Sequence, residues 1–220
     1  MSEVIAIDGP AGSGKSTVAK ILASRLGYTY LDTGAMYRAV ALLVKENDVD
    51  LSDKKAIRDL CRTMKIRFYW NKGIQQVFLG ERNITDDIRN SYIDMLSSKV
   101  SAIKEVRDEM TALQRKMAQG NNIVAEGRDM GTVVFPNAKI KFFLTASFDV
   151  RVKRRFLERK KKGEPVSFEQ IREELKKRDR QDESREIAPL RPAKDAIIID
   201  TTDMSIEEVV DKMLSYIEKS

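Results

Sequence analysis

A glycine-rich segment near the start of the sequence has the residue types and the spacing of a phosphate-binding loop. It reads Gly9-Pro-Ala-Gly-Ser-Gly14-Lys15-Ser16 and lies between a run rich in Val and Ile (3–8) and a helical pattern (15–26). In such loops the glycines let backbone amides surround a polyphosphate, a lysine reaches the β- and γ-phosphates, and a hydroxyl holds Mg²⁺. The alternative, a glycine-rich turn that caps a helix, does not explain the full motif in its strand-to-helix context. The residues expected to bind ATP here are Gly9, Pro10, Ala11, Gly12, Ser13, Gly14, Lys15, Ser16 and Thr17.

The composition excludes several other kinds of chemistry. The sequence has no histidine, which excludes histidine general bases, serine-protease triads and histidine-ligated metals. Its single cysteine, Cys61, cannot form an internal disulfide, and its place in a helical pattern favours a packed side chain over a reactive thiol. The Asn-Lys-x-Asp motif of GTP-binding proteins does not occur. The chemistry is therefore left to lysine, arginine, carboxylates and backbone amides.

The charge of the chain predicts an anionic partner without identifying it. The net charge is +6 and the isoelectric point is near 9.3. The densest basic stretch runs from Arg151 to Lys162. A solvated helix face explains this stretch as well as all ligand roles together. Composition alone does not separate nucleic acid, membrane headgroups and nucleotides as the anionic partner, although no aromatic residues for base stacking alternate with the cations.

A phosphate-binding loop needs a sheet to position it, and the sequence predicts a parallel sheet with helices between its strands. The expected helices are 15–26, 36–45, 54–61, 86–97, 103–119, 151–162, 168–182 and 206–217. The expected strands of a parallel sheet are 3–8, 28–31, 122–126, 141–144 and 196–199. Alternation of buried strands and helices is typical of an α/β fold with a doubly wound parallel sheet. The segments 66–70, 74–79 and 82–84, separated by turns at Asn71-Lys72-Gly73 and Gly80-Glu81, predict a small inserted antiparallel sheet.

The length and hydropathy favour one globular domain away from membranes. The 220 residues, 42% of them hydrophobic, fit an α/β domain with a small insertion. The longest apolar run, 39–44, is far shorter than the ~20 residues that cross a bilayer. We expect a cytoplasmic monomer with no membrane or nucleic-acid partner.

Three further segments show that the sequence resembles the bacterial cytidylate kinases. They are Asp32-Thr-Gly-Ala-Met-Tyr-Arg38, Glu126-Gly-Arg-Asp-Met-Gly-Thr-Val-Val-Phe-Pro136, and Arg178-Asp179 with Asp182, Arg185 and Ala188-Pro-Leu190. The resemblance covers nearly the whole chain, 1–220, as one kinase domain. It implies a core, a region for the nucleoside monophosphate at about 37–118 that includes the insert at 66–84, and a lid at about 150–166. It also implies transfer of the γ-phosphoryl group of ATP to CMP or dCMP.

The same resemblance implies roles for individual residues. The implied catalytic residues are Lys15, Arg128 and Arg178. The implied CMP-binding residues are Thr33, Tyr37, Arg38, Ser98, Arg107, Arg128, Asp129, Arg178, Asp182 and Arg185. Arginine suits phosphate because its planar fork grips two oxygens, and a buried Asp129 would favour the amino group of cytosine over the carbonyl of uracil. Spacing alone leaves the alternative that Arg107, Asp182 and Arg185 are solvated charges and that Tyr37 and Ser98 are packing residues.

Two positions depart from the family pattern, and the lid adds candidate cations. Thr33 stands where Ser is usual and keeps the hydroxyl, and Glu126 stands where Asp is usual at the end of the third core strand. Ser16 and Glu126 are the implied Mg²⁺ residues, with Glu126 acting through water. The lid contributes Arg154, Arg155 and Arg159 as candidates for ATP binding, without a choice among them. The main rival functions are a phosphate-loop kinase for another acceptor, such as UMP, AMP or shikimate, and an ATP-dependent nucleic-acid-binding module.

Overall fold

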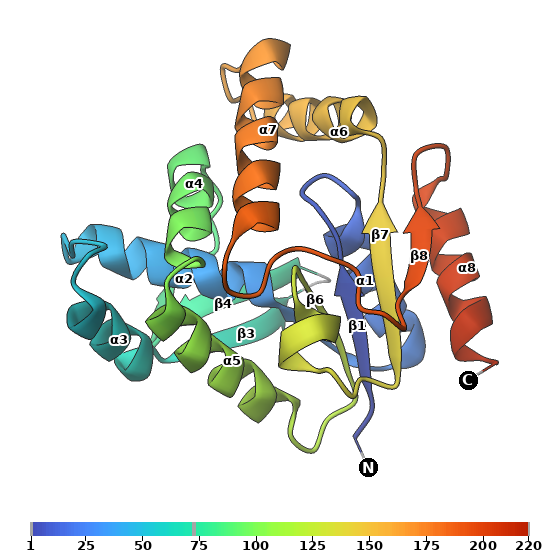
Figure 1. Cartoon of the computed structure of the whole chain (residues 1–220), viewed down its shortest axis with the longest axis horizontal. Coiled ribbons are helices and arrows are strands. Elements are labelled where there is room, and N and C mark those ends of the chain that lie inside the picture. The colour runs from blue at the N-terminus through green and yellow to red at the C-terminus, as the bar shows by residue number, and fades with distance from the viewer. Residues whose placement is uncertain (1, 72–73, 220) are drawn as a thin grey trace. The chain divides into compact units, whose positions relative to one another are not determined.

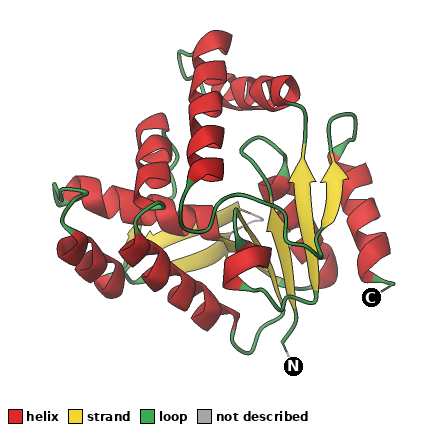
Figure 2. Ribbon diagram, viewed as in Figure 1, coloured by secondary structure: helices red, strands yellow, loops and turns green. Residues whose placement is uncertain are grey.

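The computed structural model describes residues 2–71 and 74–219, and the chain divides into two compact units. We call Met1–Asp32 with Met117–Ser220 the core unit, and Thr33–Lys116 the inserted unit. The core unit carries the phosphate-binding loop, and the inserted unit carries the antiparallel sheet. Figures 1 and 2 show the elements of each unit.

The core unit is built on a five-stranded sheet, which is parallel as the alternating pattern predicts. Its strand order is β2-β6-β1-β7-β8. Its strands are β1 (Val4–Asp8), β2 (Thr29–Asp32), β6 (Ile123–Gly127), β7 (Ile140–Thr145) and β8 (Ile197–Asp200). Every residue of β6 is buried, which explains why all of them except Glu126 are small or apolar. Because β1 lies between β6 and β7, its carboxyl end adjoins the ends of both neighbours. An open parallel sheet binds its ligands at this edge.

The helices of the core unit are α1 (Lys15–Leu26), α6 (Phe148–Lys161), α7 (Phe168–Ser184) and α8 (Ile206–Ile217), with one π-helical turn, η1 (Met130–Val134). The main hydrophobic core joins the sheet to α1 and α8 and includes Leu22, Phe142 and Met213. Helix α1 ends at Gly27, whose φ of +67° suits glycine, as its sequence predicts. Ser205 caps α8 through a capping box with Glu208, which also confirms its predicted start.

The inserted unit contains α2 (Thr33–Glu46), α3 (Lys54–Thr63), α4 (Ser91–Val100) and α5 (Lys104–Ala118), with strands β3 (Ile66–Asn71), β4 (Ile74–Leu79) and β5 (Arg82–Asn83). The three strands form the predicted antiparallel sheet in the order β3-β4-β5. Of the predicted first turn, Lys72 and Gly73 lie outside the described residues. Helix α3 begins after Asp53, whose carboxylate accepts a hydrogen bond from the Ala56 amide.

Several element boundaries differ from the expectation. Helix α2 begins at Thr33, directly after β2, instead of at Met36. Helix α4 begins at Ser91 instead of Asp86, because the Asn90 side chain accepts a hydrogen bond from the Ile93 amide and so caps the helix there. The turn η1 was not predicted. Among the described helices, none has the length and apolar character needed to cross a membrane.

Candidate active site

The loop after β1 forms a closely packed cradle at the start of α1. Gly14, with φ +89°, precedes the helix, and its carbonyl accepts hydrogen bonds from the amides of Thr17 and Val18. The Lys15 Nζ donates to the Pro10 carbonyl across the loop at 3.2 Å. A Cβ on Gly9 would lie 2.1 Å from the Leu144 carbonyl oxygen, and one on Gly12 would lie 2.9 Å from the Arg151 carbonyl oxygen. The glycines are therefore needed for the loop to approach β7 and α6.

Glu126, at the end of β6, connects the loop to the neighbouring strand. Its Oε1 accepts hydrogen bonds from the Ser16 hydroxyl at 2.7 Å and from the Tyr30 hydroxyl at 3.1 Å. Its Oε2 lies 4.0 Å from the Lys15 Nζ. The longer glutamate side chain thus reaches the phosphate-binding loop. Its hydrogen bond with Ser16 brings the two residues expected to hold Mg²⁺ into direct contact.

Three arginines gather around a buried carboxylate of α7. The Arg128 Nε donates to the Asp182 Oδ2 at 2.8 Å. Burial alone would raise the pKa of Asp182, but the positive charges of Arg128, Arg178 and Arg185 outweigh it and lower the pKa. The structure therefore brings together four of the residues predicted to bind CMP: Arg128, Arg178, Asp182 and Arg185.

The same cluster reaches the loop lysine. Burial, followed by the charge of Arg128, lowers the pKa of Lys15 to about 7, while Glu126 acts in the opposite direction. Arg178 also lowers it. Lys15, Glu126, Arg128 and Arg178 thus share one dry, positively charged region, which is the environment that a polyphosphate requires.

Asp129 follows Arg128 and is held in a buried turn. Its side chain is buried and its backbone, at φ −148° and ψ 23°, is not helical. The next residues form η1, whose first amides, those of Met130 and Gly131, donate to the carboxylate of Asp8 at 2.8 Å each. Asp8 lies at the end of β1, so the strand that carries the phosphate-binding loop also holds the turn that carries Asp129.

Arg151 connects α6, α7 and the phosphate-binding loop. Its Nη1 donates to the Ala11 carbonyl at 3.1 Å and to the Asp179 Oδ2 at 2.7 Å, and its Nε donates to the Ala146 carbonyl. Both charged side chains are buried. Asp179 adjoins Arg178 in sequence, so this ion pair helps fix the part of α7 that carries the predicted catalytic arginine.

The three predicted lid arginines have different surroundings. Arg154 donates to the Thr201 hydroxyl at 3.0 Å and to the Thr201 carbonyl at 2.6 Å. Thr201 in turn donates to the Ser13 carbonyl, which links Arg154 to the phosphate-binding loop. Arg159 is buried between two carboxylates, those of Glu164 and Glu174, and Arg155 pairs with Glu158 on the surface.

The basic stretch that includes these arginines is therefore not a uniform solvated face. Arg151 and Arg159 are buried and ion-paired, and Arg154 is turned toward Thr201. Such a distribution does not form the continuous basic surface that a nucleic-acid backbone contacts. The nucleic-acid-binding rival has no support in this helix.

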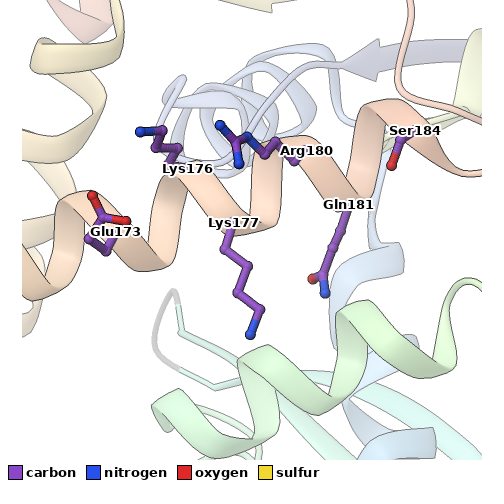
Figure 3. Close-up of a pocket in the computed structure, with 6 residues that line it drawn as sticks. All are labelled: Glu173, Lys176, Lys177, Arg180, Gln181 and Ser184. Carbon is purple, nitrogen blue, oxygen red and sulfur yellow. The ribbon is translucent and has the colours of Figure 1, made fainter.

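Helix α7 separates this machinery from an exposed polar face. A hollow of about 450 Å³ is lined by Glu173, Lys176, Lys177, Arg180, Gln181 and Ser184. Figure 3 shows these side chains along α7. Arg178 and Asp182 lie on the other side of the helix, and Arg185 follows its last residue, Ser184. None of the lining residues is a predicted site residue.

The inserted unit holds the remaining predicted residues in its own helices. Arg107 on α5 is buried; its guanidinium lies 5.4 Å from the centre of the Tyr37 ring and donates to the Ser101 carbonyl at 3.1 Å. The Ser101 hydroxyl donates to the Ser98 carbonyl, and Ser98 is itself buried. Helices α2 and α4 pack together within the unit, and this packing, with the Arg107–Tyr37 contact, brings Tyr37, Ser98 and Arg107 into one neighbourhood.

Two further predicted residues lie on α2. The Arg38 Nη1 lies 3.9 Å from the Asp94 Oδ1 of α4, and Thr33 is buried at the start of α2. Arg38 remains partly exposed within this pairing. Asp94 was not predicted from sequence, although an acidic residue in the first turn of α4 is a usual sign of a helix start.

Sequence reasoning also missed four residues of the core unit: Asp8, Arg151, Asp179 and Thr201. A carboxylate at the end of the apolar strand β1 was the only signal for Asp8. Arg151 lay within a charged run, where burial has no sequence signal. All four act through contacts with residues far away in the sequence.

Comparison with known proteins places the chain in a family. A family model described as cytidylate kinase matches residues 5–219. The cytidylate kinase of Caldicellulosiruptor bescii is 49% identical over 215 residues, which cover 98% of this chain and 95% of that protein. The cytidylate kinase of Carboxydothermus hydrogenoformans is 52% identical over 213 residues, which cover 97% of this chain and 96% of that protein.

Solved structures agree on the fold. An uncharacterized protein from Eubacterium ventriosum has a TM-score of 0.54 at 16% identity, with complete coverage of both chains. The shikimate kinase from Bacteroides thetaiotaomicron has a TM-score of 0.50 at 12% identity, with 98% of each chain covered. At these identities the likeness concerns the fold alone. The identities near 50% and the family match over nearly the whole length decide the assignment: the chain belongs to the cytidylate kinase family.

Proposed function

We infer that this chain transfers the γ-phosphoryl group of ATP to CMP or dCMP, giving ADP and CDP or dCDP. The observation that carries this inference is the cluster of Lys15, Arg128 and Arg178 beside Glu126 and Asp182, at the carboxyl edge of the sheet, in a member of the cytidylate kinase family. Phosphoryl transfer between two nucleotides needs positive charge around repelling phosphates more than it needs a strong base, because a phosphate monoester is already ionised near pH 7. The absence of histidine is compatible with this chemistry.

We propose that the residues 9–17 bind the phosphates of ATP. The proposal is supported by the glycines that allow the close loop path and by Lys15, which is held inside the loop by its bond to the Pro10 carbonyl. The backbone amides of such a loop favour polyphosphate without any need for side-chain rearrangement. The ammonium group of Lys15 would stabilise the negative charge that develops on the transferred phosphoryl group.

Mg²⁺ fits the donors that this site offers. The Ser16 hydroxyl and the Glu126 carboxylate are oxygen donors only 2.7 Å apart, which suits a hard cation bound in part through water. The described part of the chain holds no cluster of three or more acidic, histidine or cysteine side chains that could bind a metal alone. We therefore propose that Ser16 and a water held by Glu126 bind Mg²⁺ together with phosphate oxygens. When bound, the ion would neutralise charge on the phosphates of ATP.

We propose that Arg128 and Arg178 hold the phosphate of the acceptor. The proposal is supported by their shared neighbourhood with Lys15 and by Asp182, which binds the Nε of Arg128 and so orients its fork. Orientation matters because the acceptor oxygen must lie in line with the bond that breaks. Asp182 and Arg185 are proposed to lie beside the ribose.

We propose that Asp129 reads the base. A buried carboxylate accepts from the exocyclic amino group of cytosine but repels the carbonyl oxygen that uracil presents at the same place. The burial of Asp129 supports this role, since a carboxylate away from water discriminates strongly between an amino group and a carbonyl oxygen.

For the inserted unit we propose acceptor binding by Thr33, Tyr37, Arg38, Ser98 and Arg107. Support comes from the burial of Arg107 and Ser98 and from the helix packing that holds Arg107 over the Tyr37 ring. A buried guanidinium keeps its positive charge, so it would attract a ligand with acceptor oxygens.

The region 150–166 is proposed as a lid over ATP, with α6 as its arm. Of the three lid arginines, Arg154 has the most direct connection to the phosphate-binding loop, through Thr201 and Ser13. Arg159 would have to leave Glu164 and Glu174 to reach a phosphate, so we propose Arg154 and Arg155 as the first candidates. Closure of a lid excludes water that would otherwise hydrolyse ATP.

A coupled assay of ADP release with CMP, dCMP, UMP, AMP and shikimate as acceptors tests the proposal. CMP and dCMP should be the best acceptors. The variant Asp129→Ala should lose its preference for CMP over UMP by about 10-fold or more, since leaving a buried polar group unpaired costs about 1–3 kcal/mol. An unchanged ratio would remove Asp129 from base recognition, and equal use of AMP or shikimate would overturn the acceptor assignment.

A further inference from the structure

The turn after Asp129 is capped in an unusual way. Helical turns begin with amides that lack a partner inside the turn, and an aspartate at the preceding position normally accepts one of them with its own side chain. Asp129 occupies this position before η1 but makes no such capping bond. The first amides of η1 must therefore find another acceptor.

Asp8 supplies that acceptor from the neighbouring strand. Its Oδ1 accepts from the Met130 amide and its Oδ2 accepts from the Gly131 amide, both at 2.8 Å. Asp8 is 3% exposed, so water does not compete for these bonds. Both carboxylate oxygens are engaged by consecutive amides, an arrangement that fixes the position of the turn as well as its start.

The other side of the turn is held as well. A Cβ on Gly131 would lie 3.1 Å from the Lys141 Cδ, so the turn packs closely on the lysine stem. The Lys141 Nζ donates to the Pro136 carbonyl and binds both carboxylate oxygens of Asp195. The segment from Asp129 to Pro136 is thus held by Asp8 on one side and by Lys141 on the other, and the bonds of Asp8 are the ones nearer to Asp129.

We propose that Asp8 is a positioning residue for base recognition: its carboxylate caps η1 in place of Asp129 and so fixes the turn that carries Asp129 at the acceptor base. This inference rests on the proposed function and deepens it. The end of β1 would then have two roles. It leads into the phosphate-binding loop, and through Asp8 it positions Asp129, the residue proposed to select the acceptor. Donor and acceptor sites would then share one rigid support.

The electrostatic surroundings of Asp8 agree with this geometry and suggest a suitable substitution. Two amide donors favour an ionised carboxylate, because protonation reduces the acceptor capacity of one oxygen. Burial raises the pKa of Asp8 to about 7, and the negative charge of Asp129 also raises this pKa. The two amide hydrogen bonds and the positive charge of Arg128 lower it. An assay at pH 8 keeps Asp8 ionised, and Asp8→Asn keeps one acceptor while placing an amide group against Gly131.

The test compares Asp8→Asn with a matched acid-to-amide change in the same strand region, Glu3→Gln. Glu3 precedes β1 at its opposite end and binds Tyr28 and Lys139, far along the strand from the turn. At pH 8 with CMP and UMP as acceptors, Asp8→Asn should raise the KM for CMP and lower the CMP:UMP ratio of kcat/KM by about 10-fold, the effect of one lost buried hydrogen bond. The KM for ATP should stay within about twofold of the native value. Glu3→Gln should change neither quantity.

A merely structural role would give a different result. If Asp8→Asn lowered the melting temperature or kcat but left the CMP:UMP ratio and the CMP KM at native values, as expected for Glu3→Gln, the proposal would be overturned. Combining Asp8→Asn with Asp129→Ala should lower the ratio no further than Asp129→Ala alone, since both changes act on one interaction. Additive losses would also contradict the proposal.

Two safeguards keep the test decisive. If Asp8→Asn does not fold, Gly131→Ala disturbs the same amide while keeping the carboxylate. Its Cβ would press on the stem of Lys141, whose Nζ is held by Pro136 and Asp195. It should lower the CMP:UMP ratio in the same direction, and an unchanged ratio would overturn the proposal. Failure of the native chain to make CDP would instead refute the proposed function, so the two failures are distinguishable.

Discussion

The close approach of the phosphate-binding loop to β7 makes Gly9→Ala a sharp test of the site's architecture. The added Cβ would lie 2.1 Å from the Leu144 carbonyl oxygen and 3.1 Å from its carbon, where real Cβ atoms essentially never come below 3.0 Å. The obstructing atoms belong to the backbone of a buried strand and cannot rotate away. Strands β1 and β7 would have to separate by about 1 Å to restore ordinary contact.

The cost follows from what this separation disturbs. Overpacking of this kind costs about 1–3 kcal/mol, and each weakened hydrogen bond between the strands costs about 1 kcal/mol. Residues 5–8 of β1 pair with residues 140–143 of β7, so several such bonds are at risk. We expect Gly9→Ala to lower the free energy of unfolding by roughly 4 kcal/mol.

Gly27→Ala is the matched control. Gly27 also has a positive φ, +67°, but no described atom lies within 4 Å of the position of its Cβ. Its substitution therefore carries only the left-handed backbone penalty of about 1 kcal/mol. For a chain of this size the remaining difference of roughly 3 kcal/mol should place the melting temperature of Gly9→Ala roughly 10 °C below that of Gly27→Ala.

Thermal unfolding followed by far-ultraviolet circular dichroism, without nucleotide, measures both variants against the native chain. The absence of nucleotide matters, because ligand binding would add its own stabilisation. Equal melting temperatures for Gly9→Ala and Gly27→Ala would refute the reasoning, because the close packing of the loop against Leu144 would then not limit the site.

Three other outcomes follow from the same structure. Ser16→Ala should weaken binding of Mg²⁺-ATP by about 10-fold while leaving metal-free ATP nearly unchanged in calorimetric titrations; an equal loss for both forms would contradict a metal role. The pKa of Asp8 is about 7 in the folded chain and about 4 when unfolded, so the folded chain binds this proton more tightly. The free energy of unfolding of the native chain, relative to that of Asp8→Asn, should therefore fall by about 3 kcal/mol from pH 5 to pH 8. A stability difference that does not vary with pH would contradict it. Burial raises the pKa of Cys61 to about 12, so the thiol should resist aromatic disulfide reagents at pH 8 until urea unfolds the chain, and rapid labelling of the folded chain would refute its packed position.

Most of the fold could be predicted because its signals are local. The start and end of α1 depend on the glycine loop and on Gly27, and α8 depends on the capping box of Ser205 with Glu208. The strands of the parallel sheet are indicated by short runs of apolar residues, although the edge strand β8 is only partly buried. The start of α4 was misplaced because the apolar spacing continues before Asn90, whereas the cap of that side chain decides where the helix begins.

The turn η1 had no local signal. Its sequence, Met130–Val134, contains glycine and β-branched residues, which are poor helix formers, and it forms because Asp8 receives its first amides. The contact joins residues more than a hundred positions apart. A pattern read along one segment cannot show such a partner.

The candidate site divides in the same way. The motif residues of the loop and the arginines of the resemblance were nameable from sequence, and in the core unit Lys15, Arg128, Arg178 and Asp182 lie together. What sequence could not show was which cations of the basic stretch are buried. Arg151 binds the Ala11 carbonyl and Asp179, so its purpose depends on two partners from other parts of the chain.

The identity of the product tests the central claim most directly. The native chain should be incubated with ATP, CMP and Mg²⁺, and the nucleotides separated by anion exchange. We predict that CDP and ADP appear in equal amounts, and that both fall to background when Lys15 is replaced in Lys15→Met. Release of ADP with inorganic phosphate and no CDP would contradict the account.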